Sequence, residues 1–261
     1  TPFTFIATAE VIALLGATPV FVDINPRTFN MAPEKLDSAI QTFKSASLMS
    51  DIRHPTSGLT PKGIVTVDLF GLPCEYDEIN GIAKEHELFV IEDAAQALGG
   101  EYHGKKTCAL AEVGCTSFFP AKPLGAYGDG GAVFTDNEGI AEILRSILVH
   151  GKGIHKYDNA RIGLNARLDT LQAAILLAKM DIFAEEIELR QKVAQKYTEG
   201  LSDNETLTVP YIPEGHKSAW AQYSVLAKDG VLKADLQARL KENGVPTAVY
   251  YPKPLHLQSA F

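Results

Sequence analysis

The fold is decided by residues 63–70 (GIVTVDLF) and 88–91 (LFVI), two short runs that are nearly continuous in apolar side chains. Strands covered on both faces of a parallel sheet have such continuous runs, whereas half-exposed strands alternate apolar and polar residues. Three further runs share the pattern: 19–24 (PVFVDI), 114–119 (GCTSFF) and 131–135 (GAVFT). The sequence therefore predicts five short, buried strands.

Helical patterns separate these strands, at about residues 7–15, 33–44, 76–86 and 138–149. An alternation of strands and helices is typical of an α/β domain, since each helix carries the chain back across the sheet to start the next parallel strand. We therefore expect an α/β fold with a mostly parallel sheet and helices on both faces.

One long amphipathic helix, of roughly 30 residues, is predicted from about residue 170 onward. Asp169 and Gln172 have the spacing of a capping box at its start. Apolar side chains then recur at helical spacing: Leu171, Ile175, Ala178, Ile182, Leu189, Val193 and Tyr197. Because a helix of this length often bridges two domains, we expect a large domain over residues 1–180. Residues 181–261 would hold the rest of this linking helix and a smaller C-terminal domain.

The smaller unit is expected to contain a strand near residues 221–227, a helix near 233–243 and a further short element at 245–251. Residues 45–61 have no period and are rich in Ser, Thr and Pro. That composition predicts a long loop between two regular elements.

Composition and charge exclude several classes of protein. Of 261 residues, 46% are hydrophobic and 21% are charged, as in globular proteins, so disordered and fibrous classes are excluded. The formal net charge is −8 and the Lys and Arg residues are scattered, which argues against a nucleic-acid binder. No run reaches the roughly 18 uninterrupted apolar residues of a membrane span.

The numbers and spacing of cysteine and histidine argue against disulfide bonds and structural metal ions. The chain has 3 cysteines, an odd number without paired spacing, which favours reduced thiols in a cytoplasmic protein. Among the 7 histidines, His150 and His155 are close in sequence, but glycines lie between them and they do not have the spacing of a helical metal pair. We therefore expect no metal site.

The residues most able to carry chemistry follow the predicted strands, because ligands of parallel sheets bind at the carboxyl ends of the strands. Lys122 lies between Pro120 and Pro123 in a run that is otherwise uncharged from 113 to 127. It is either a solvated loop lysine or an amine held in place and made nucleophilic by partial burial. Asp93 is either the N-cap of a short helix or a buried carboxylate that charges a ring nitrogen.

Other motifs of catalysis are absent from the sequence. The glycine-dense residues 125–131 (GAYGDGG) match neither the dinucleotide-binding nor the P-loop pattern, so they indicate only a tightly turning backbone. No nucleophile elbow and no zinc-protease motif occur. From the residues alone, the chain is an α/β enzyme with a lysine and an acid near one crevice.

Five blocks of sequence together resemble the DegT/DnrJ/EryC1/StrS sugar aminotransferases. They span almost the whole chain in collinear order: TFIATAEVIALLGATPVFVDI (4–24), VIEDAAQALGG (90–100), TSFFPAKPLGAYGDGGAVFT (116–135), RIGLNARLDTLQAAIL (161–176) and TAVYYPKPLHLQ (247–258). The resemblance implies a fold-type I enzyme dependent on pyridoxal 5′-phosphate (PLP).

The resemblance also implies roles by position. Lys122 matches the lysine that forms a Schiff base with PLP and then moves the proton, and Asp93 matches the carboxylate paired with the pyridinium nitrogen. Ser117 matches a ligand of the cofactor phosphate, and Gln96 matches a residue near the phenolic oxygen.

Five further positions complete this implied site. The aromatic Phe5 matches the residue that stacks on the cofactor ring. Asn165 matches a residue that reaches the cofactor phosphate of the neighbouring subunit, which implies a homodimer with a shared site. Arg167 would face a carboxylate of the sugar or of glutamate, or else form a salt bridge with a neighbour such as Asp169. Tyr250 and Tyr251 fall where relatives place a His-Tyr pair near the sugar.

The implied reaction moves an amino group from glutamate to a keto carbon of a nucleotide-linked sugar. The chain is most similar to family members that act on the 3-keto carbon of a UDP-linked N-acetylhexuronate, although Tyr250 departs from their His-Tyr pair. A 3- or 4-keto-6-deoxyhexose nucleotide is the alternative substrate. A PLP-dependent sugar dehydratase of the same fold would have histidine in place of Lys122, and a non-catalytic regulatory protein would not need Lys122, Asp93 and Gln96.

Members of the family have a segment ahead of the T-F-x-A-T block, with a Ser-Gly-Thr turn that binds the PLP phosphate. The sequence begins at Thr1 without that segment, and it ends at Phe261, where relatives continue through the small domain. We therefore expect a chain truncated at both ends, which by itself would bind PLP weakly or fail to fold.

Overall fold

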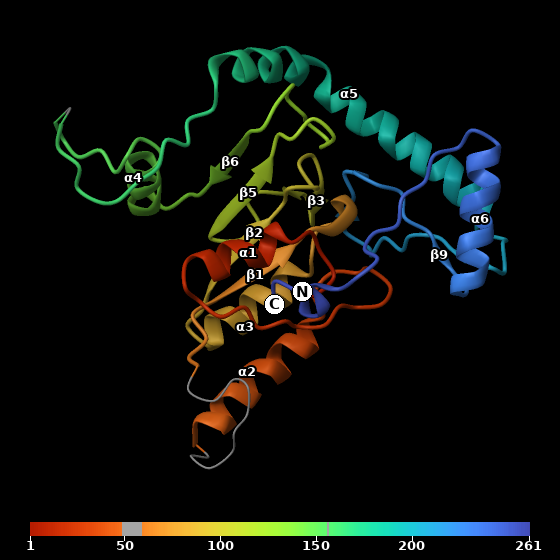
Figure 1. The fold of residues 1–261 in the computed structure, drawn as a ribbon, viewed down its shortest axis with the longest axis horizontal. Coiled ribbons are helices and arrows are strands. Elements are labelled where there is room, and N and C mark those ends of the chain that lie inside the picture. The colour runs from red at the N-terminus through yellow and green to blue at the C-terminus, as the bar shows by residue number, and fades with distance from the viewer. Residues whose placement is uncertain (49–58, 156) are drawn as a thin grey trace.

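The computed structural model describes residues 1–48, 59–155 and 157–261, and its centre is a four-stranded sheet (Figure 1). The strands lie in the order β1-β2-β5-β6, with bounds Gly63–Val67, Phe89–Asp93, Val113–Ser117 and Gly131–Phe134. β1, β2 and β5 are parallel, and β6 pairs antiparallel with β5. The prediction of a mostly parallel sheet is therefore confirmed.

The register of the parallel strands places their carboxyl ends at one edge. Val67 is opposite Asp93, and Asp93 is in turn opposite Cys115. Residues that follow β1, β2 and β5 therefore leave the sheet side by side. In open parallel sheets this edge is where ligands bind.

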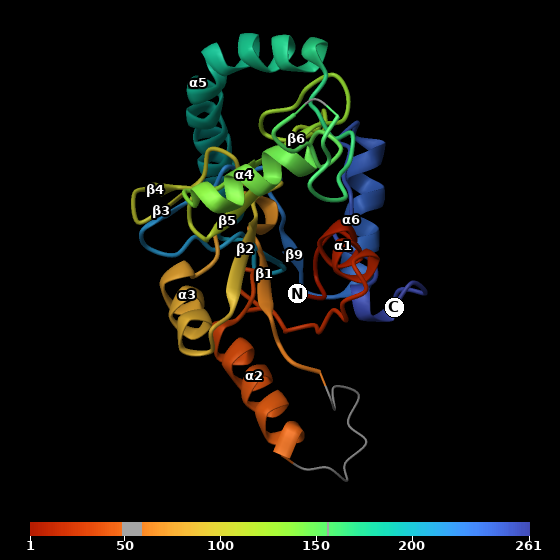
Figure 2. The ribbon, with the colours of Figure 1, turned by 90° about the vertical axis from the view of Figure 1, so that its left-hand side faces the viewer.

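Helices cover both faces of the sheet (Figure 2). α2 (Pro33–Leu48) and α3 (Tyr76–Glu85) lie on one side, where Leu36, Ile79 and Val90 belong to the main hydrophobic core. α1 (Ala7–Leu14) lies on the opposite side. Burial of both faces explains why the strand sequences are apolar runs and not alternating patterns.

The predicted long helix is α5, Thr170–Leu201, with 32 residues. Its first half packs Leu176 against Phe118, Leu124 and Ala126, the segment that follows β5. Its second half leads to the smaller C-terminal elements (Figure 1). The division between residues 180 and 181 stays a prediction, and α5 runs through that point without a break.

The remaining elements are short. They are η1 (Leu69–Gly71), β3 (Glu101–Tyr102), β4 (Lys105–Lys106), α4 (Glu138–Ile147), β7 (Leu207–Thr208), β8 (His216–Lys217), β9 (Leu226–Ala227), α6 (Gly230–Glu242) and η2 (Leu255–Leu257). β8 pairs with β3, so the C-terminal part of the chain is joined to the large sheet region through the β3–β4 hairpin. β7 pairs with β9 next to α6 in a separate small sheet.

The structure corrects several predicted elements. Residues 19–24 form no regular strand, because their backbone partners are the adjacent turn and not the sheet: Ile24 bridges Met31, and Ala32 N–H donates to Asp23 O. The strand predicted at 221–227 is only the two-residue β9, and 245–251 contains no regular element. Of the loop predicted at 45–61, residues 45–48 belong to α2, and 49–58 lie outside the described residues.

The predicted capping box at the start of α5 is also wrong. Asp169 is the N-cap residue, but its side chain makes no capping hydrogen bond. Gln172 uses its amide oxygen to accept the Tyr127 N–H at 2.8 Å, and therefore holds the glycine-dense turn instead of the helix end. A tertiary contact here replaces the local one.

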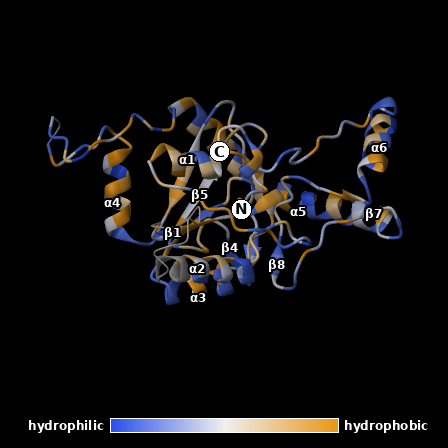
Figure 3. Cartoon of the chain, turned by 60° about the horizontal axis from the view of Figure 1, so that its bottom comes forward, coloured by the Kyte–Doolittle hydropathy of each residue, from blue (hydrophilic) through white to orange (hydrophobic). Residues whose placement is uncertain are grey.

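Two segments stand apart from this core. α4 carries exposed hydrophobic residues such as Ile143 away from the sheet (Figure 3). We call residues 148–155 and 157–168, which lead from α4 to α5, the arm; it projects from the molecule in Figure 1. In the part of the chain that the structure describes, no helix has both the length and the apolar character needed to cross a membrane.

Candidate functional site

Lys122 lies in a tight loop that follows β5. The Lys122 N–H donates to Phe119 O at 2.9 Å, and the Ala126 N–H donates to Phe118 O at 2.7 Å, which closes the loop on itself. The side chain is half-buried, and this burial lowers the pKa of the Lys122 ammonium, while the nearby Asp93 carboxylate acts in the opposite direction. The reading of Lys122 as a fully solvated loop lysine is therefore wrong.

Asp93 is the last residue of β2, at the carboxyl edge of the sheet. Its Oδ1 accepts the Ala95 N–H at 3.1 Å, and its Oδ2 accepts the Thr8 hydroxyl at 2.7 Å. Residues 95–98 form turns and no helix, so Asp93 is not the N-cap of a helix. An ionised carboxylate has about four lone-pair sites, and these two donors therefore leave room for a further donor.

Gln96 joins the sheet edge to the C-terminal part of the chain. Its Oε1 accepts the Phe70 N–H at 2.6 Å, and its Nε2 donates to the Tyr251 hydroxyl at 3.3 Å. Burial raises the pKa of the Tyr251 hydroxyl. The Phe70 ring lies 6.1 Å from the Tyr250 ring, so both predicted tyrosines are brought to the same edge as Gln96.

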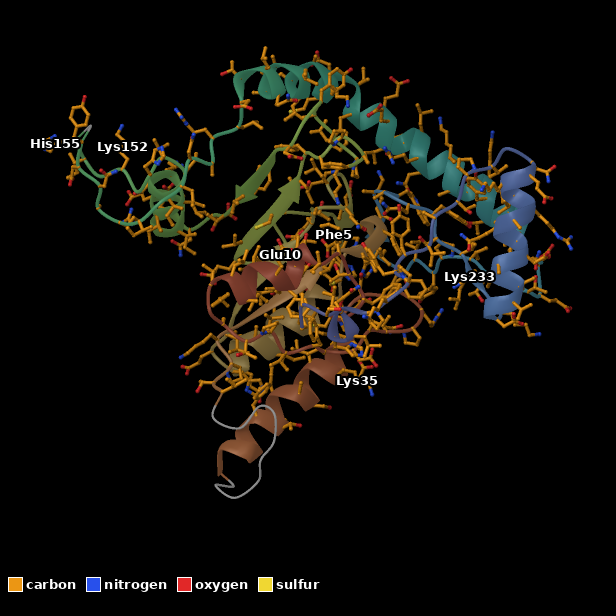
Figure 4. The ribbon with its side chains drawn as sticks, in the orientation of Figure 1. Phe5, Glu10, Lys35, Lys152, His155 and Lys233 are labelled. Carbon is orange, nitrogen blue, oxygen red and sulfur yellow. The ribbon has the colours of Figure 1, made fainter. Side chains whose placement is uncertain are left out.

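Two further residues of the predicted site are Ser117 and Phe5. Ser117 ends β5, and its Oγ accepts the Phe119 N–H at 3.2 Å. Phe5 comes just before Ile6, the N-cap residue of α1, and it is 59% exposed. Figure 4 places Phe5 over the middle of the molecule, far from Lys152 and His155 at the tip of the arm.

The structure does not bring Asn165 and Arg167 to the cluster. Both lie exposed on the arm, where the Arg167 Nε–H donates to Asn165 Oδ1 at 3.0 Å. Asn165 also bridges Val149, which fixes the arm to itself. Within the described residues, Arg167 pairs with Asn165 and makes no salt bridge with Asp169.

Two residues near the site were not predicted from the sequence. Thr8 belongs to the T-F-x-A-T block and lies four residues after Thr4, which is also buried. Two threonines at this spacing in an otherwise apolar segment are a signal that could have been used. Lys179 of α5 donates to Gly125 O at 2.6 Å and so holds the loop that carries Lys122. Nothing in the sequence pattern distinguishes Lys179 from a solvated helix lysine.

A pair of carboxyl groups, separate from Asp93, lies buried behind the site. Asp68 and Glu92 are both 0% exposed on the α3 face of the sheet. Burial raises the pKa of both groups, and the Glu92 charge raises that of Asp68 further. Tyr76 O–H and Cys74 N–H donate to Asp68 Oδ1 at 2.8 and 3.0 Å.

Comparison with known proteins gives a consistent result. A model of the DegT/DnrJ/EryC1/StrS aminotransferase family matches residues 1–261. The UDP-2-acetamido-2-deoxy-3-oxo-D-glucuronate aminotransferase of Pseudomonas aeruginosa is 48% identical over 260 residues, which cover 99% of this chain and 66% of that protein.

Solved structures agree in fold. A DegT DnrJ EryC1 StrS aminotransferase from Brucella abortus matches with a TM-score of 0.92 and 49% identity, over 100% of this chain and 66% of that one. NtdA from Bacillus subtilis, solved with bound cofactor PMP, matches with a TM-score of 0.81 and 30% identity, over 98% of this chain and 55% of that one. The chain therefore spans 66% of the length of the first two proteins. Because the family model matches every residue from first to last, this chain belongs to the DegT/DnrJ/EryC1/StrS aminotransferase family.

Proposed function

We propose that the chain is the main part of a cytoplasmic, PLP-dependent aminotransferase for nucleotide-linked sugars. The observation that carries the proposal is the Lys122 ammonium, half-buried at the carboxyl edge of the sheet and within the electrostatic reach of Asp93. An amine and a carboxylate in one crevice are the two groups that PLP enzymes place at opposite ends of the cofactor. The three described cysteines are free thiols, as expected in a reducing compartment.

The residues present fit PLP. Among the described residues, the Lys122 ammonium has no hydrogen-bond or ion-pair partner, so a bound ligand would supply one. Asp93 would accept from the ring nitrogen, Ser117 would donate its hydroxyl to the phosphate, and Phe5 would cover the ring. Gln96 would use its remaining amide hydrogen near the phenolic oxygen. When bound, PLP supplies an electrophilic carbon and an electron-withdrawing ring.

Lys122 is the residue that would accept and donate protons in this proposal. Burial lowers the pKa of its ammonium, so a larger fraction of Nζ is neutral at a given pH and able to attack or to accept a proton. The closed loop around Phe118 and Ala126 fixes the backbone from which Nζ extends. Asp93, held by its two donors, provides a carboxylate in a fixed orientation at the same edge of the sheet.

We further propose glutamate as amino donor and the 3-keto carbon of a UDP-linked N-acetylhexuronate as acceptor. The support is the 48% identity to the Pseudomonas aeruginosa enzyme, whose name specifies a 3-oxo-glucuronate. Arg167 would bind a carboxylate of the sugar or of glutamate with its two-pronged guanidinium. Tyr251, fixed by Gln96, and the neighbouring Tyr250 would line the sugar pocket.

The active enzyme is proposed to be a homodimer in which Asn165 reaches the cofactor phosphate of the partner subunit. Exposure of Asn165 and Arg167 on the arm, away from Lys122, is the reason for this proposal. If either side chain takes part in the reaction, it would do so in the site of the partner subunit, as the family resemblance implies for Asn165.

The cofactor proposal is tested by borohydride reduction in the presence of PLP followed by peptide mapping. We expect a stable pyridoxyl group on Lys122 alone. Lys122→Arg keeps the positive charge and should remove the label, whereas the matched Lys179→Arg should keep it. The experiment uses the full-length protein. Labelling at any other lysine, or none in the full-length wild-type protein, would refute the proposal.

The substrate proposal is tested by measuring 2-oxoglutarate formed from glutamate. We expect formation with a UDP-linked 3-keto-N-acetylhexuronate and much less with the same sugar reduced at C6 to the alcohol. A dTDP-linked 4-keto-6-deoxyhexose is the second comparison. Preference for that sugar would favour the alternative substrate class, and sugar deoxygenation without 2-oxoglutarate would indicate the dehydratase.

A further inference from the structure

We propose that Thr8 is a positioning residue that holds the Asp93 carboxylate in the orientation in which it would accept from the ring nitrogen of PLP. The inference rests on the proposed function, because it concerns the group that Asp93 would bind. It assigns to α1, which contributes no group to the predicted catalytic pair, control over one member of that pair.

The geometry defines a directed chain of hydrogen bonds. Thr8 is 8% exposed, and its hydroxyl donates to Asp93 Oδ2 at 2.7 Å. A threonine hydroxyl has a single hydrogen. In the 3.2 Å contact between the Thr4 and Thr8 hydroxyls, Thr8 must therefore accept and Thr4 must donate. The hydrogen bonds therefore run from Thr4 through Thr8 to the carboxylate of Asp93.

These hydrogen bonds orient the Asp93 carboxylate. The Thr8 hydroxyl holds Oδ2, and a hydrogen bond to a carboxylate is shorter and stronger than one between neutral groups. The Ala95 N–H supports Oδ1 in the same way at 3.1 Å. With each oxygen held by one donor, the carboxylate plane is fixed, and its remaining lone pairs point in set directions.

A purely structural role for Thr8 is the rival explanation. α1 exposes much of its surface, with Leu14 78% and Leu15 87% exposed, and its only buried residues are Thr8 and Ala9. The bond to Asp93 also ties this helix to the sheet. A loss of cofactor affinity on mutation of Thr8 would therefore not by itself separate the two roles.

A cofactor analogue separates them. In 1-deaza-PLP a C–H replaces the ring nitrogen, so the analogue cannot use the Asp93 carboxylate but keeps the phosphate and aldehyde. The experiment titrates the protein with PLP and with this analogue and compares the two dissociation constants. Thr8→Val removes the hydroxyl with little change in shape, and Thr8→Ser keeps a hydroxyl.

We expect Thr8→Val to weaken PLP binding by about tenfold and binding of the analogue much less. The variant loses the hydrogen bond that orients Asp93, and only PLP has a ring nitrogen that binds to Asp93. Thr8→Ser should restore most of the preference for PLP. Thr4→Val, which removes the more distant donor, should have the same effect but smaller. Equal weakening of both ligands by Thr8→Val would overturn the proposal and leave a structural tether.

A matched control is Thr107→Val. Thr107 is as buried as Thr8, but its hydroxyl donates to the Ala97 carbonyl at 2.6 Å and not to a carboxylate. This variant should lower stability without changing the ratio of the two dissociation constants.

If circular dichroism shows that Thr8→Val does not fold, Thr4→Val and Thr8→Ala make the same comparison. Failure of the full-length wild-type protein to bind PLP at Lys122 overturns the proposed function as well, whereas normal binding with an unchanged ratio overturns only this inference.

Discussion

The carboxyl edge of the sheet and the arm carry candidate site residues in opposite ways. At the edge, Asp93 and Gln96 are tied by hydrogen bonds to residues distant in sequence, such as Thr8 and Tyr251. On the arm, the polar contact of Arg167 is with Asn165, two residues away, and both side chains are exposed. The first region is positioned by contacts across the sheet edge, whereas the Asn165–Arg167 pair of the second is positioned by contacts within the arm.

The two regions therefore differ in what the mutation of a site residue should change. Edge residues are embedded in the fold, so their mutation changes chemistry and stability together. Arm residues contribute little to the stability of this chain, because exposed positions without tertiary partners tolerate substitution. Their mutation should therefore change binding or catalysis alone.

The largest expected effect comes from breaking each region in a separate copy. Lys122→Ala should lower activity by about 10³-fold or more, because nucleophile and base are lost together. Asn165→Ala should also be nearly inactive if it completes the partner's site. Mixing and refolding the two variants in equal amounts should restore about one quarter of wild-type activity, since half of the dimers then contain one intact site.

The control for this mixing experiment is Lys122→Ala combined with an Asn165→Ala, Lys122→Ala double variant, which cannot form an intact site. No recovery should occur there. Absence of recovery in the first mixture, with mixed dimers demonstrated by native mass spectrometry, would mean that Asn165 does not act across a dimer.

Arg167→Met should raise KM for the carboxylate-bearing substrate by about tenfold or more, because a charge-assisted hydrogen bond is lost. The melting temperature should remain that of the wild type, since the side chain is exposed. Arg161→Met, on the same arm, is the matched control and should change neither quantity. A lower melting temperature for Arg167→Met with unchanged KM would give the arginine a structural role.

The same contrast explains how much was predictable from the sequence. Continuous apolar runs identified β1, β2, β5 and β6, and the position of Asp93 after such a run placed it at the ligand-binding edge. Periodicity could not show that residues 19–24 lack a sheet partner, because extended conformation and pairing are separate properties. Tertiary bonds such as Gln172 to Tyr127 were equally beyond local pattern.

The site was predicted mainly through the family resemblance, and the positions of individual residues differ in how well local sequence could support them. Pro120 and Pro123 marked Lys122 as constrained. Thr8 depends on a bond to a residue 85 positions away, which no local pattern contains. Arm residues have no burial signal at all, and their role remains a prediction.

Buried titratable groups should make the stability of the fold depend on pH, most strongly at Asp68, behind the sheet edge. Burial, and then the Glu92 charge, raises the pKa of Asp68 above its ordinary value of 3.8. The folded state therefore keeps a proton that the unfolded state loses, so stability falls as pH rises above about 4. Asp68→Asn stays neutral and should be more stable than the wild type at pH 8 by about 1 kcal/mol or more, and less so at pH 4.5.

Urea unfolding at both pH values measures this difference. Asp136→Asn, at an exposed position, should follow the wild-type protein at each pH. Parallel stability curves for Asp68→Asn and wild type would show that Asp68 ionises in the folded state as easily as in the unfolded one.

A smaller effect of opposite sign is expected at Lys122, measured without PLP. Burial lowers the pKa of its ammonium below 10.5, so the folded state gives up its proton at a lower pH than the unfolded state. The cost of this buried charge is complete below the folded pKa and disappears as pH approaches 10.5. Lys122→Met should therefore be more stable than wild type near pH 7, with the difference shrinking steadily toward pH 10.5. Lys152→Met on the arm should differ from wild type by less than about 0.5 kcal/mol throughout. A constant advantage of Lys122→Met across this range would instead reflect apolar packing by the new side chain, and the lysine at the edge would then cost the fold as little as a lysine on the arm.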